Sequence, residues 1–321
     1  MGQLVEIGSV YMIEVQSLFR YYGDFRAVND LSFTIQSNTV VGFLGLNGAG
    51  KTSTLKVLAG LLPPSSGKVI MDGVDLAEAS VSFRSKIGFL PEDPPLYLEM
   101  TVSAFLAYVG SIRGLGGADL AARLQSVIKR CQLDDVKNRV IDELSHGYRK
   151  RVGIAQAIIH RPKLVILDEP ISGLDPVQIV EMRRVIKSLS DDCTVLVSSH
   201  ILSEISQTCD QVLVLKDGSL VASGTEKSLS ERFHSGKLLL MTLVGEEDAV
   251  TGFLSVRPDV ASFDIQSVSE GQVEVNVEMT DDHRETLVAG LVGAGIGLRR
   301  LEDARDELEE IFLDLTKEGE A

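Results

Sequence analysis

The spacing of apolar residues divides most of the chain into alternating strands and helices. Residues 13–19 and 31–35 alternate between apolar and polar side chains, as strands with one buried face do. Residues 40–44 form an unbroken apolar run, which is typical of a central strand covered on both faces. Strands that alternate with helices predict an α/β fold with a largely parallel sheet. The further predicted elements are helices at 51–59, 147–160 and 176–189, two helices within 101–132 separated by Gly114, Gly116 and Gly117, and strands at 164–167 and 195–197.

A second pattern begins after Gly236 and reads strand, helix, strand, strand, helix, strand. This βαββαβ order predicts a small α+β domain of the ferredoxin-like kind. For a last helix that follows it, core packing and a dimer contact are both open uses of the apolar face. The six elements are at 238–244, 247–255, 262–268, 272–277, 282–292 and 296–301, and the last helix carries Leu308, Ile311, Phe312 and Leu315 on that face.

The balance of charge changes at the same place. Residues 237–321 carry 7 Lys and Arg against 20 Asp and Glu, whereas residues 1–236 carry 24 against 26. We therefore predict two domains, 12–236 and 237–321, with residues 1–11 as an extension before the first.

Composition narrows the classes of function. The net charge is −15, aromatic residues make up 5% and Trp is absent, so no nucleic-acid partner is expected. The cysteines Cys131, Cys193 and Cys209 are scattered and lack the spacing of metal ligands. There is no signal peptide, and no apolar run approaches the roughly 18 residues that cross a bilayer. We expect a cytoplasmic protein that contacts a membrane only through a partner.

Residues 45–52 read Gly-Leu-Asn-Gly-Ala-Gly-Lys-Thr, which fits the phosphate-loop pattern between a predicted strand and a predicted helix. The glycines let backbone N–H groups turn towards phosphate oxygens at the positive end of a helix. Lys51 adds a point charge on the same oxygens, and the Thr52 hydroxyl is a ligand for Mg²⁺. The predicted nucleotide contacts of this loop are Asn47, Gly48, Ala49, Gly50, Lys51, Thr52 and Ser53.

An apolar strand at 164–167 ends in two carboxylates, Asp168 and Glu169. A solvated strand end also has this appearance. Downstream of a phosphate loop, however, the pair predicts that Asp168 holds Mg²⁺ through water and that Glu169 polarises the attacking water.

Residues 144–151 read Leu-Ser-His-Gly-Tyr-Arg-Lys-Arg. Here the chain resembles the ABC ATPase family, whose signature is Leu-Ser-Gly-Gly-Gln. It looks like the subgroup with a Leu-Ser-x-Gly-Tyr form, which pairs with a separate permease in drug-efflux and gliding-motility transporters. The resemblance implies a P-loop NTPase fold of the ABC type, with a mixed sheet and antiparallel and helical subdomains. It also implies that Ser145 and Gly147 meet the γ-phosphate bound by another subunit, while His146 is a tolerated departure from the family's Gly.

Further matches to the family lie on either side of this motif. Tyr22 corresponds to the aromatic residue that stacks on adenine, with Tyr21 as the alternative. Residues 172–175 match the turn that contacts the opposite subunit. His200 matches the switch histidine, which implies a hydrogen bond to the γ-phosphate and a role in holding the water of Glu169.

One further position departs from the family's pattern. Glu92 stands at the end of a strand where the family commonly has Gln, and its carboxylate is predicted to ligate Mg²⁺ together with Thr52 and Asp168. Residues 93–98 after it are apolar and stiffened by proline, and they are predicted to dock a cytoplasmic helix of a permease.

The sequence thus predicts an ATPase that binds ATP and Mg²⁺ between two ATP-binding subunits, by default a homodimer. It would drive a separate transmembrane permease from the inner face of the cell membrane, with export favoured by the resemblance. Two other classes stay open. A soluble ABC protein acting on ribosomes or DNA is disfavoured by the single nucleotide domain and the acidic tail. A regulatory module would use the C-terminal domain as a ligand sensor.

Overall fold

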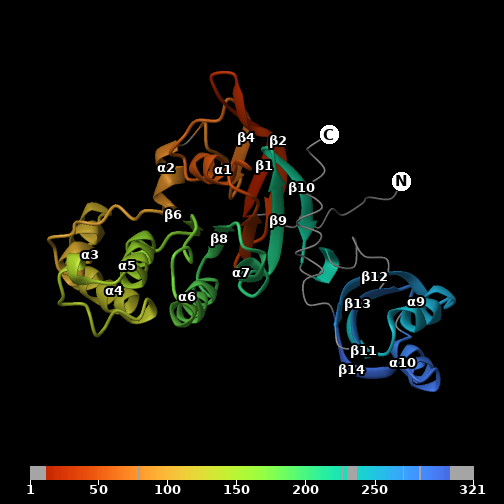
Figure 1. Ribbon diagram of the computed structural model, residues 1–321. Coiled ribbons are helices and arrows are strands. Elements are labelled where there is room, and N and C mark those ends of the chain that lie inside the picture. Colours follow the sequence, from red (N-terminus) through yellow and green to blue (C-terminus); the bar gives the residue numbers. More distant parts are fainter. Residues whose placement is uncertain are drawn as a thin grey trace, which may run out of the picture. The chain divides into compact units, whose positions relative to one another are not determined.

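The computed structural model consists of two compact units, Met1–Glu226 and Lys227–Ala321 (Figure 1). It describes residues 12–78, 80–225, 227–229, 237–269, 271–281 and 283–303. The predicted extension at 1–11, the predicted last helix and the predicted domain boundary at 236 lie outside these described residues.

A six-stranded sheet forms the centre of the first unit. Its strand order is β10-β9-β3-β8-β7-β6, and all neighbours are parallel except the edge pair β9 and β10. The three inner strands β3, β8 and β7 are fully buried along their length. The strands are β3 (Val40–Leu44), β6 (Ile87–Leu90), β7 (Leu164–Leu167), β8 (Thr194–Ser199), β9 (Gln211–Lys216) and β10 (Ser219–Gly224). The largely parallel sheet predicted from the apolar runs is confirmed.

A second, antiparallel sheet of order β2-β1-β4-β5 lies in the same unit. It contains β1 (Ile13–Tyr22), β2 (Phe25–Ile35), β4 (Ser66–Met71) and β5 (Val74–Asp75). One hydrophobic core joins the two sheets through helix α1 (Lys51–Leu58), with members from both sheets and from the helix. The helix is therefore held on both sides, which fixes the loop that leads into it.

Helices form a separate group beside the parallel sheet (Figure 1). It comprises α3 (Val102–Ile112), α4 (Gly117–Arg130) and α5 (His146–Ile158), with the 3-10 turn η1 (Ile141–Glu143) before α5. The interruption predicted at the glycines is confirmed, since α3 ends just before Gly114, which has a φ of 87°. The remaining helices of this unit are α2 (Ser80–Ser85), α6 (Pro176–Leu189) and α7 (Leu202–Ser206).

Helix α5 packs directly on strand β6 because two glycines allow close approach. A Cβ atom on Gly88 would lie 2.1 Å from the carbonyl oxygen of Ala157. A Cβ atom on Gly153 would lie 2.5 Å from Cδ1 of Leu90 and 3.1 Å from Cβ of Pro94. The helix, the end of β6 and the start of the following loop are thus in tight contact.

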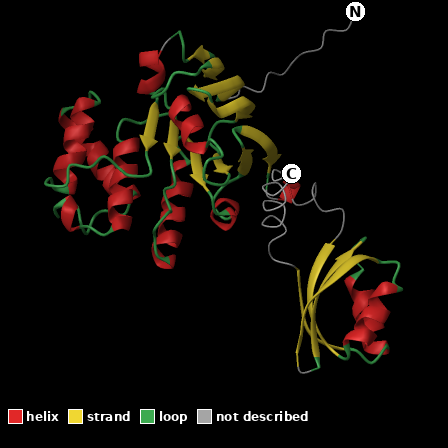
Figure 2. Ribbon diagram, turned by 45° about the horizontal axis from the view of Figure 1, so that its top comes forward, coloured by secondary structure: helices red, strands yellow, loops and turns green. Residues whose placement is uncertain are grey.

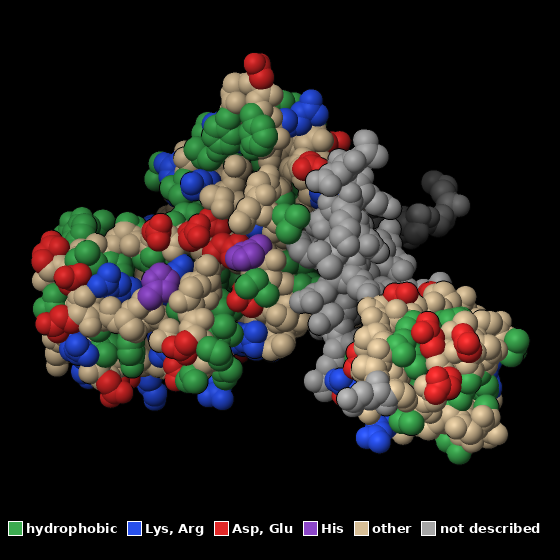
Figure 3. Space-filling model, in the orientation of Figure 1, with side chains coloured by type: hydrophobic (Ala, Val, Ile, Leu, Met, Phe, Trp, Pro, Cys, Tyr) green, Lys and Arg blue, Asp and Glu red, His purple; other side chains and the backbone are tan. Residues whose placement is uncertain are grey.

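The second unit has the predicted βαββαβ order. Its sheet has the order β12-β13-β11-β14 with every pair antiparallel. Two helices cover one face of the sheet, as Figure 2 shows, and share a core with it. Acidic side chains are numerous on the face of this unit that Figure 3 displays. The elements are β11 (Lys237–Val244), α9 (Glu247–Ser255), β12 (Val260–Ser269), β13 (Gln272–Met279), α10 (Arg284–Gly293) and β14 (Gly297–Asp303).

Among the described residues, no helix combines the length and the apolar character needed to cross a membrane.

Candidate functional site

The phosphate loop connects the buried strand β3 to helix α1, as the sequence predicts. Gly48 and Gly50 both have a φ of 90°, a conformation that side chains disfavour. At Gly50 space is closed as well, because a Cβ atom would lie 2.3 Å from the carbonyl oxygen of Ala27. Gly50 is also the N-cap of α1 and offers no side-chain cap, so the first N–H groups of the helix are left for another acceptor.

Lys51 lies inside the curve of this loop and is 6% exposed. Its Nζ donates hydrogen bonds to the carbonyl oxygens of Gly45 at 2.6 Å and Leu46 at 3.3 Å. The same atom lies 3.5 Å from Oε1 of Glu169. The loop therefore presents a positive charge that a carboxylate already partly balances.

Asp168 meets Thr52 of helix α1 and Ser198 of strand β8 just beyond the end of β7. Because β7 and β8 run parallel, with Leu167 opposite Val197, their carboxyl ends come to the same edge of the sheet. The Thr52 hydroxyl donates to Oδ1 of Asp168 at 3.3 Å, and the Ser198 hydroxyl donates to the same oxygen at 2.7 Å. Asp168 is 2% exposed, so these hydroxyl groups replace water around a buried carboxylate.

Glu169 occupies an uncommon backbone conformation, with a φ of 48°. Its N–H donates to the Ser198 hydroxyl at 2.9 Å, and its carbonyl oxygen accepts a hydrogen bond from Nζ of Lys150 at 3.1 Å. Its carboxylate lies between Lys51 and His200, with Nδ1 of His200 at 3.1 Å from Oε2. The structure thus brings the two residues predicted to be catalytic into direct contact.

A cavity of about 420 Å³ opens over these groups. Nine of the residues predicted from the sequence border it, and four that border it were not predicted as contacts there. The nine are Asn47, Gly48, Gly50, Lys51, Thr52, Ser53, Glu92, Glu169 and His200, and the four are Phe25, Ala27, Leu46 and Ser172. Of the other predicted contacts, Ala49 is buried within the loop and Asp168 lies beneath Thr52.

Aromatic side chains lie at the tip of the β1–β2 hairpin. Tyr22, the predicted adenine contact, stands opposite Phe25 in the register of the hairpin, but only Phe25 borders the cavity. The guanidinium carbon of Arg20 lies 4.7 Å from the centre of the Tyr22 ring. A hydrogen bond with Ser53 lowers the pKa of Tyr22 below that of a free tyrosine. The alternative, Tyr21, stacks against Phe19. Phe25 was not predicted from the sequence. The feature that could have identified it is its position in the hairpin, directly opposite Tyr22.

The signature residues lie at the start of helix α5. Ser145 is its N-cap and accepts a hydrogen bond from the N–H of Tyr148 at 3.5 Å. A Cβ atom on Gly147 would lie 2.6 Å from Oε1 of Gln178, so this glycine allows α5 and α6 to approach closely. Ser145 and His146 are exposed to solvent, and none of the three signature residues borders the cavity of its own chain.

The residues around Thr52 fit Mg²⁺ that arrives with a phosphate ligand. Within the described part of the chain, no group of three or more His, Cys, Asp or Glu side chains is arranged to hold a metal ion. The Thr52 hydroxyl and the Asp168 carboxylate are hard oxygen donors, and Glu92 borders the same cavity. Mg²⁺ in such sites takes one or two carboxylates and completes its shell with phosphate oxygens and water.

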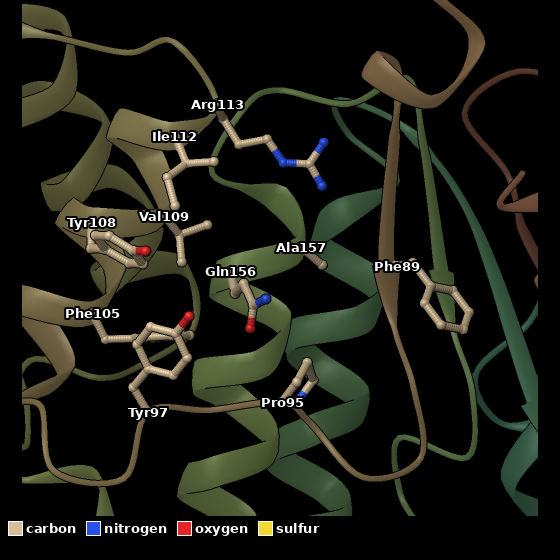
Figure 4. A pocket seen from close by; sticks show the side chains of 10 residues that line it. All are labelled: Phe89, Pro95, Tyr97, Phe105, Tyr108, Val109, Ile112, Arg113, Gln156 and Ala157. Atoms are coloured by element: carbon tan, nitrogen blue, oxygen red, sulfur yellow. The ribbon is translucent and has the colours of Figure 1, made fainter. Parts of the chain in front are cut away.

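A second cavity of about 340 Å³ lies between helix α3, helix α5 and the segment after β6 (Figure 4). Pro95 and Tyr97 of the predicted docking segment border it, together with the exposed Ile112. The ring of Tyr97 lies 5.8 Å from that of Phe105 and 5.6 Å from that of Tyr108, measured between centroids. The groove is therefore largely apolar and aromatic, with one cation, Arg113, at its border.

Comparisons with known proteins agree with this geometry. The family model described as "ABC transporter" matches residues 28–172. The chain is 32% identical over 303 residues to an uncharacterised ABC transporter ATP-binding protein, YxlF of Bacillus subtilis (strain 168), covering 94% of this chain and 98% of the relative. It is 31% identical over 310 residues to the bacitracin transport ATP-binding protein BcrA of Bacillus licheniformis, covering 96% and 98%. A solved structure of an ATP-binding subunit of an ABC transporter superposes with a TM-score of 0.62 at 30% identity, covering 69% of this chain and 93% of that chain.

Proposed function

The chain belongs to the ABC transporter family as an ATP-binding subunit with ATPase activity, and from that membership we propose how it works: two copies associate head to tail, clamp two ATP molecules between them, and drive a separate permease that exports its cargo. One observation carries this proposal. The cavity that holds Lys51, Glu169 and His200 lacks Ser145 of its own chain, which is exposed at the start of α5. A second copy would supply the missing donor.

The charges of the site suit the phosphates of ATP. The N–H groups at the start of α1 and the ammonium of Lys51 attract phosphate oxygens. The exposed start of α5 offers a second positive helix end, which in the proposed dimer would face the γ-phosphate held by the partner. The start of α1 from one copy and the start of α5 from the other would then both attract the phosphates of one ATP molecule.

Hydrolysis needs a water molecule aligned with the γ-phosphorus and a group that accepts its proton. Glu169 is suited to accept that proton because its carboxylate borders the cavity. His200 touches that carboxylate and would hold the water and the γ-phosphate in line. Thr52, Asp168 and Glu92 would hold Mg²⁺, which neutralises charge that develops on the phosphate oxygens. Loss of the γ-phosphate would remove the group shared by the two copies, so the dimer would open.

The apolar groove of Figure 4 suits the partner that this function requires. A cytoplasmic helix of the permease would place an apolar face against Tyr97, Phe105 and Ile112. The chain would then act at the inner face of the cell membrane through that contact. Export is supported by the Leu-Ser-x-Gly-Tyr form of the signature at 144–148, and transport of a cargo by the relative BcrA, which is named for bacitracin transport.

Mixing two inactive variants tests the shared site. Lys51→Ala removes the phosphate-loop charge, and Ser145→Arg blocks the signature, so each purified variant should hydrolyse ATP at background rates. In a mixture, a heterodimer regains one intact site, formed by the loop of the Ser145→Arg copy and the signature of the Lys51→Ala copy. We expect the mixture to recover a substantial fraction of wild-type activity per heterodimer, measured by phosphate release.

The control is a mixture of Lys51→Ala with Glu169→Gln. Both changes affect the half of the site that contains the phosphate loop. Each of the two sites in the heterodimer therefore carries one of the changes, and activity should stay at background. Equal activity in the two mixtures would contradict the head-to-tail arrangement. So would an inactive first mixture in which cross-linking verifies that heterodimers have formed.

A further inference from the structure

Lys150 is a buried cation that the mechanism above does not use. Its side chain is 1% exposed. Its Nζ donates hydrogen bonds to the backbone carbonyl oxygens of Glu92 at 2.5 Å and Glu169 at 3.1 Å. Among the described residues, no carboxylate forms an ion pair with it. A buried ammonium group is unfavourable unless polar groups replace its water, so the two carbonyl groups have a defined task.

Both carbonyl groups belong to residues that border the cavity over the phosphate loop. Glu92 follows strand β6 and Glu169 follows strand β7. These strands are parallel neighbours, with Leu90 opposite Leu167, so their ends lie at one edge of the sheet. Lys150 reaches this edge from helix α5 and connects the two chain segments above it.

The backbone of Glu169 needs such support. Its φ of 48° is disfavoured for a residue with a side chain and persists only where the surroundings hold it. The Ser198 hydroxyl fixes the N–H of this residue, and Lys150 fixes its carbonyl oxygen. With the peptide groups on both sides held, the direction of the Cα–Cβ bond is set, and the contacts with Lys51 and His200 then place the carboxylate.

The base of the lysine is itself held firmly. Gly153, one turn further along α5, allows that helix to contact Leu90 and Pro94 at the end of β6 and in the following loop. The ammonium group therefore extends from a helix whose distance to β6 is fixed by packing. The buried ammonium group can therefore hold the two carbonyl oxygens in place, whereas the flexible side chain of a surface lysine could not.

We propose that Lys150 is a positioning residue for ATP hydrolysis: by holding the carbonyl oxygen of Glu169 beside that of Glu92, it keeps the Glu169 carboxylate aimed at the attacking water. This rests on the proposed function, in which Glu169 accepts the proton. Lys150 itself does not border the cavity, so we expect its effect to be on the rate of the chemical step and not on the binding of ATP.

Steady-state hydrolysis by the full-length protein gives the first test. Lys150→Met keeps the length of the side chain and removes its donors, and we expect kcat to fall by about 100-fold, the scale of a small misplacement of a catalytic group. KM for ATP should stay within about twofold, because the residues that border the cavity are unchanged. Lys150→Gln keeps an uncharged amide group with two N–H donors and should recover part of the lost kcat.

Arg149→Met is the matched control. The Arg149 guanidinium also donates to two backbone carbonyl oxygens, those of Ile141 at 3.3 Å and Asp142 at 2.5 Å, but neither residue borders the cavity. This variant should keep kcat within about threefold of wild type if only the connection to Glu169 matters. An equal loss of kcat in the two methionine variants would overturn the proposal.

A double-mutant cycle decides whether Lys150 acts through Glu169. In a Glu169→Gln background, adding Lys150→Met should not slow the residual single-turnover rate further, because the group that the lysine positions is already gone. A further loss equal to that in the wild-type background would overturn the proposal. If Lys150→Met fails to fold, Lys150→Gln carries the same cycle. Failure of the proposed function looks different, since Glu169→Gln alone would then retain the wild-type rate.

Discussion

The hydroxyl group of Ser198 offers the sharpest test of how the site is held together. It is fully buried, donates to Asp168 at 2.7 Å and accepts the N–H of Glu169 at 2.9 Å. Ser198→Ala removes both hydrogen bonds at once, and the small space left by one oxygen atom gives water little room to replace them. The two residues of the proposed hydrolytic pair then lose a shared support.

The magnitude follows from the two bonds. A hydrogen bond to a charged group contributes about 1.5–3 kcal/mol, and a buried N–H left without an acceptor costs about 1–3 kcal/mol. We therefore expect Ser198→Ala to lower the free energy of unfolding by about 3–5 kcal/mol. Because Glu169 also loses one of the contacts that fix its backbone, kcat for ATP should fall by about tenfold or more.

Urea unfolding followed by circular dichroism measures the first effect, and phosphate release measures the second. The control is Ser188→Ala on α6, where the half-buried hydroxyl donates only to the carbonyl oxygen of Val185 in its own helix. That change should alter stability by less than about 0.5 kcal/mol, because alanine favours the helix. A loss below about 1 kcal/mol for Ser198→Ala, or equal losses for the two variants, would refute the reasoning.

Two further predictions concern the loop and a buried carboxyl group. Gly50→Ala should abolish binding of a fluorescent ATP analogue, because the new Cβ atom would lie 2.3 Å from the carbonyl oxygen of Ala27. Gly23→Ala, at a φ of 59° but in open space, should cost only about 1–2 kcal/mol and keep binding, so loss of binding in both would contradict the steric argument. Glu204 accepts a hydrogen bond from Ser199, and burial raises its pKa above that of a free glutamate. A raised carboxyl pKa stabilises the fold at low pH, and this contribution is lost as pH rises through the folded-state value. Glu204→Gln removes the ionisation, so its Tm relative to wild type should rise as the pH increases above about 4.3, the pKa of an unfolded-state glutamate, and a flat or falling difference would contradict this.

The strong apolar runs explain why much of the fold was predicted. Strand 164–167 and helix 176–189 are found with the predicted bounds, because a fully buried strand and a helix that begins at Pro176 leave clear patterns. Strands β4 and β5 were missed. β4 reads Ser-Gly-Lys-Val-Ile-Met, with its first three residues exposed, and it is defined by pairing with the distant strand β1. Such non-local pairing leaves little trace in the local pattern.

In the site, too, residues within one continuous motif were predicted, whereas residues that only the fold brings together were not. The phosphate loop is a continuous motif, so its residues were predicted together, and their roles stay predictions. The supports of Glu169 come from strand β8 and helix α5, which only the fold brings near. Lys150 did leave a signal. It lies three, four and seven residues before Gly153, Ile154 and Ala157, which are all buried, so a charged residue stood on the buried face of the predicted helix and required a partner.

The ends of two helices explain why closure of the proposed dimer would depend on the nucleotide. Helix α1 has neither a side-chain cap nor an acidic residue in its first turn, and α5 has only the exposed Ser145 and no acidic residue there. By contrast, α9 and α10 carry acidic residues in their first turns. The positive ends of α1 and α5 are therefore left for an external anion. In a head-to-tail pair, the γ-phosphate would be the part of ATP nearest to α5 of the partner. Its removal by hydrolysis would then release that helix first, while the remaining phosphates stay on α1.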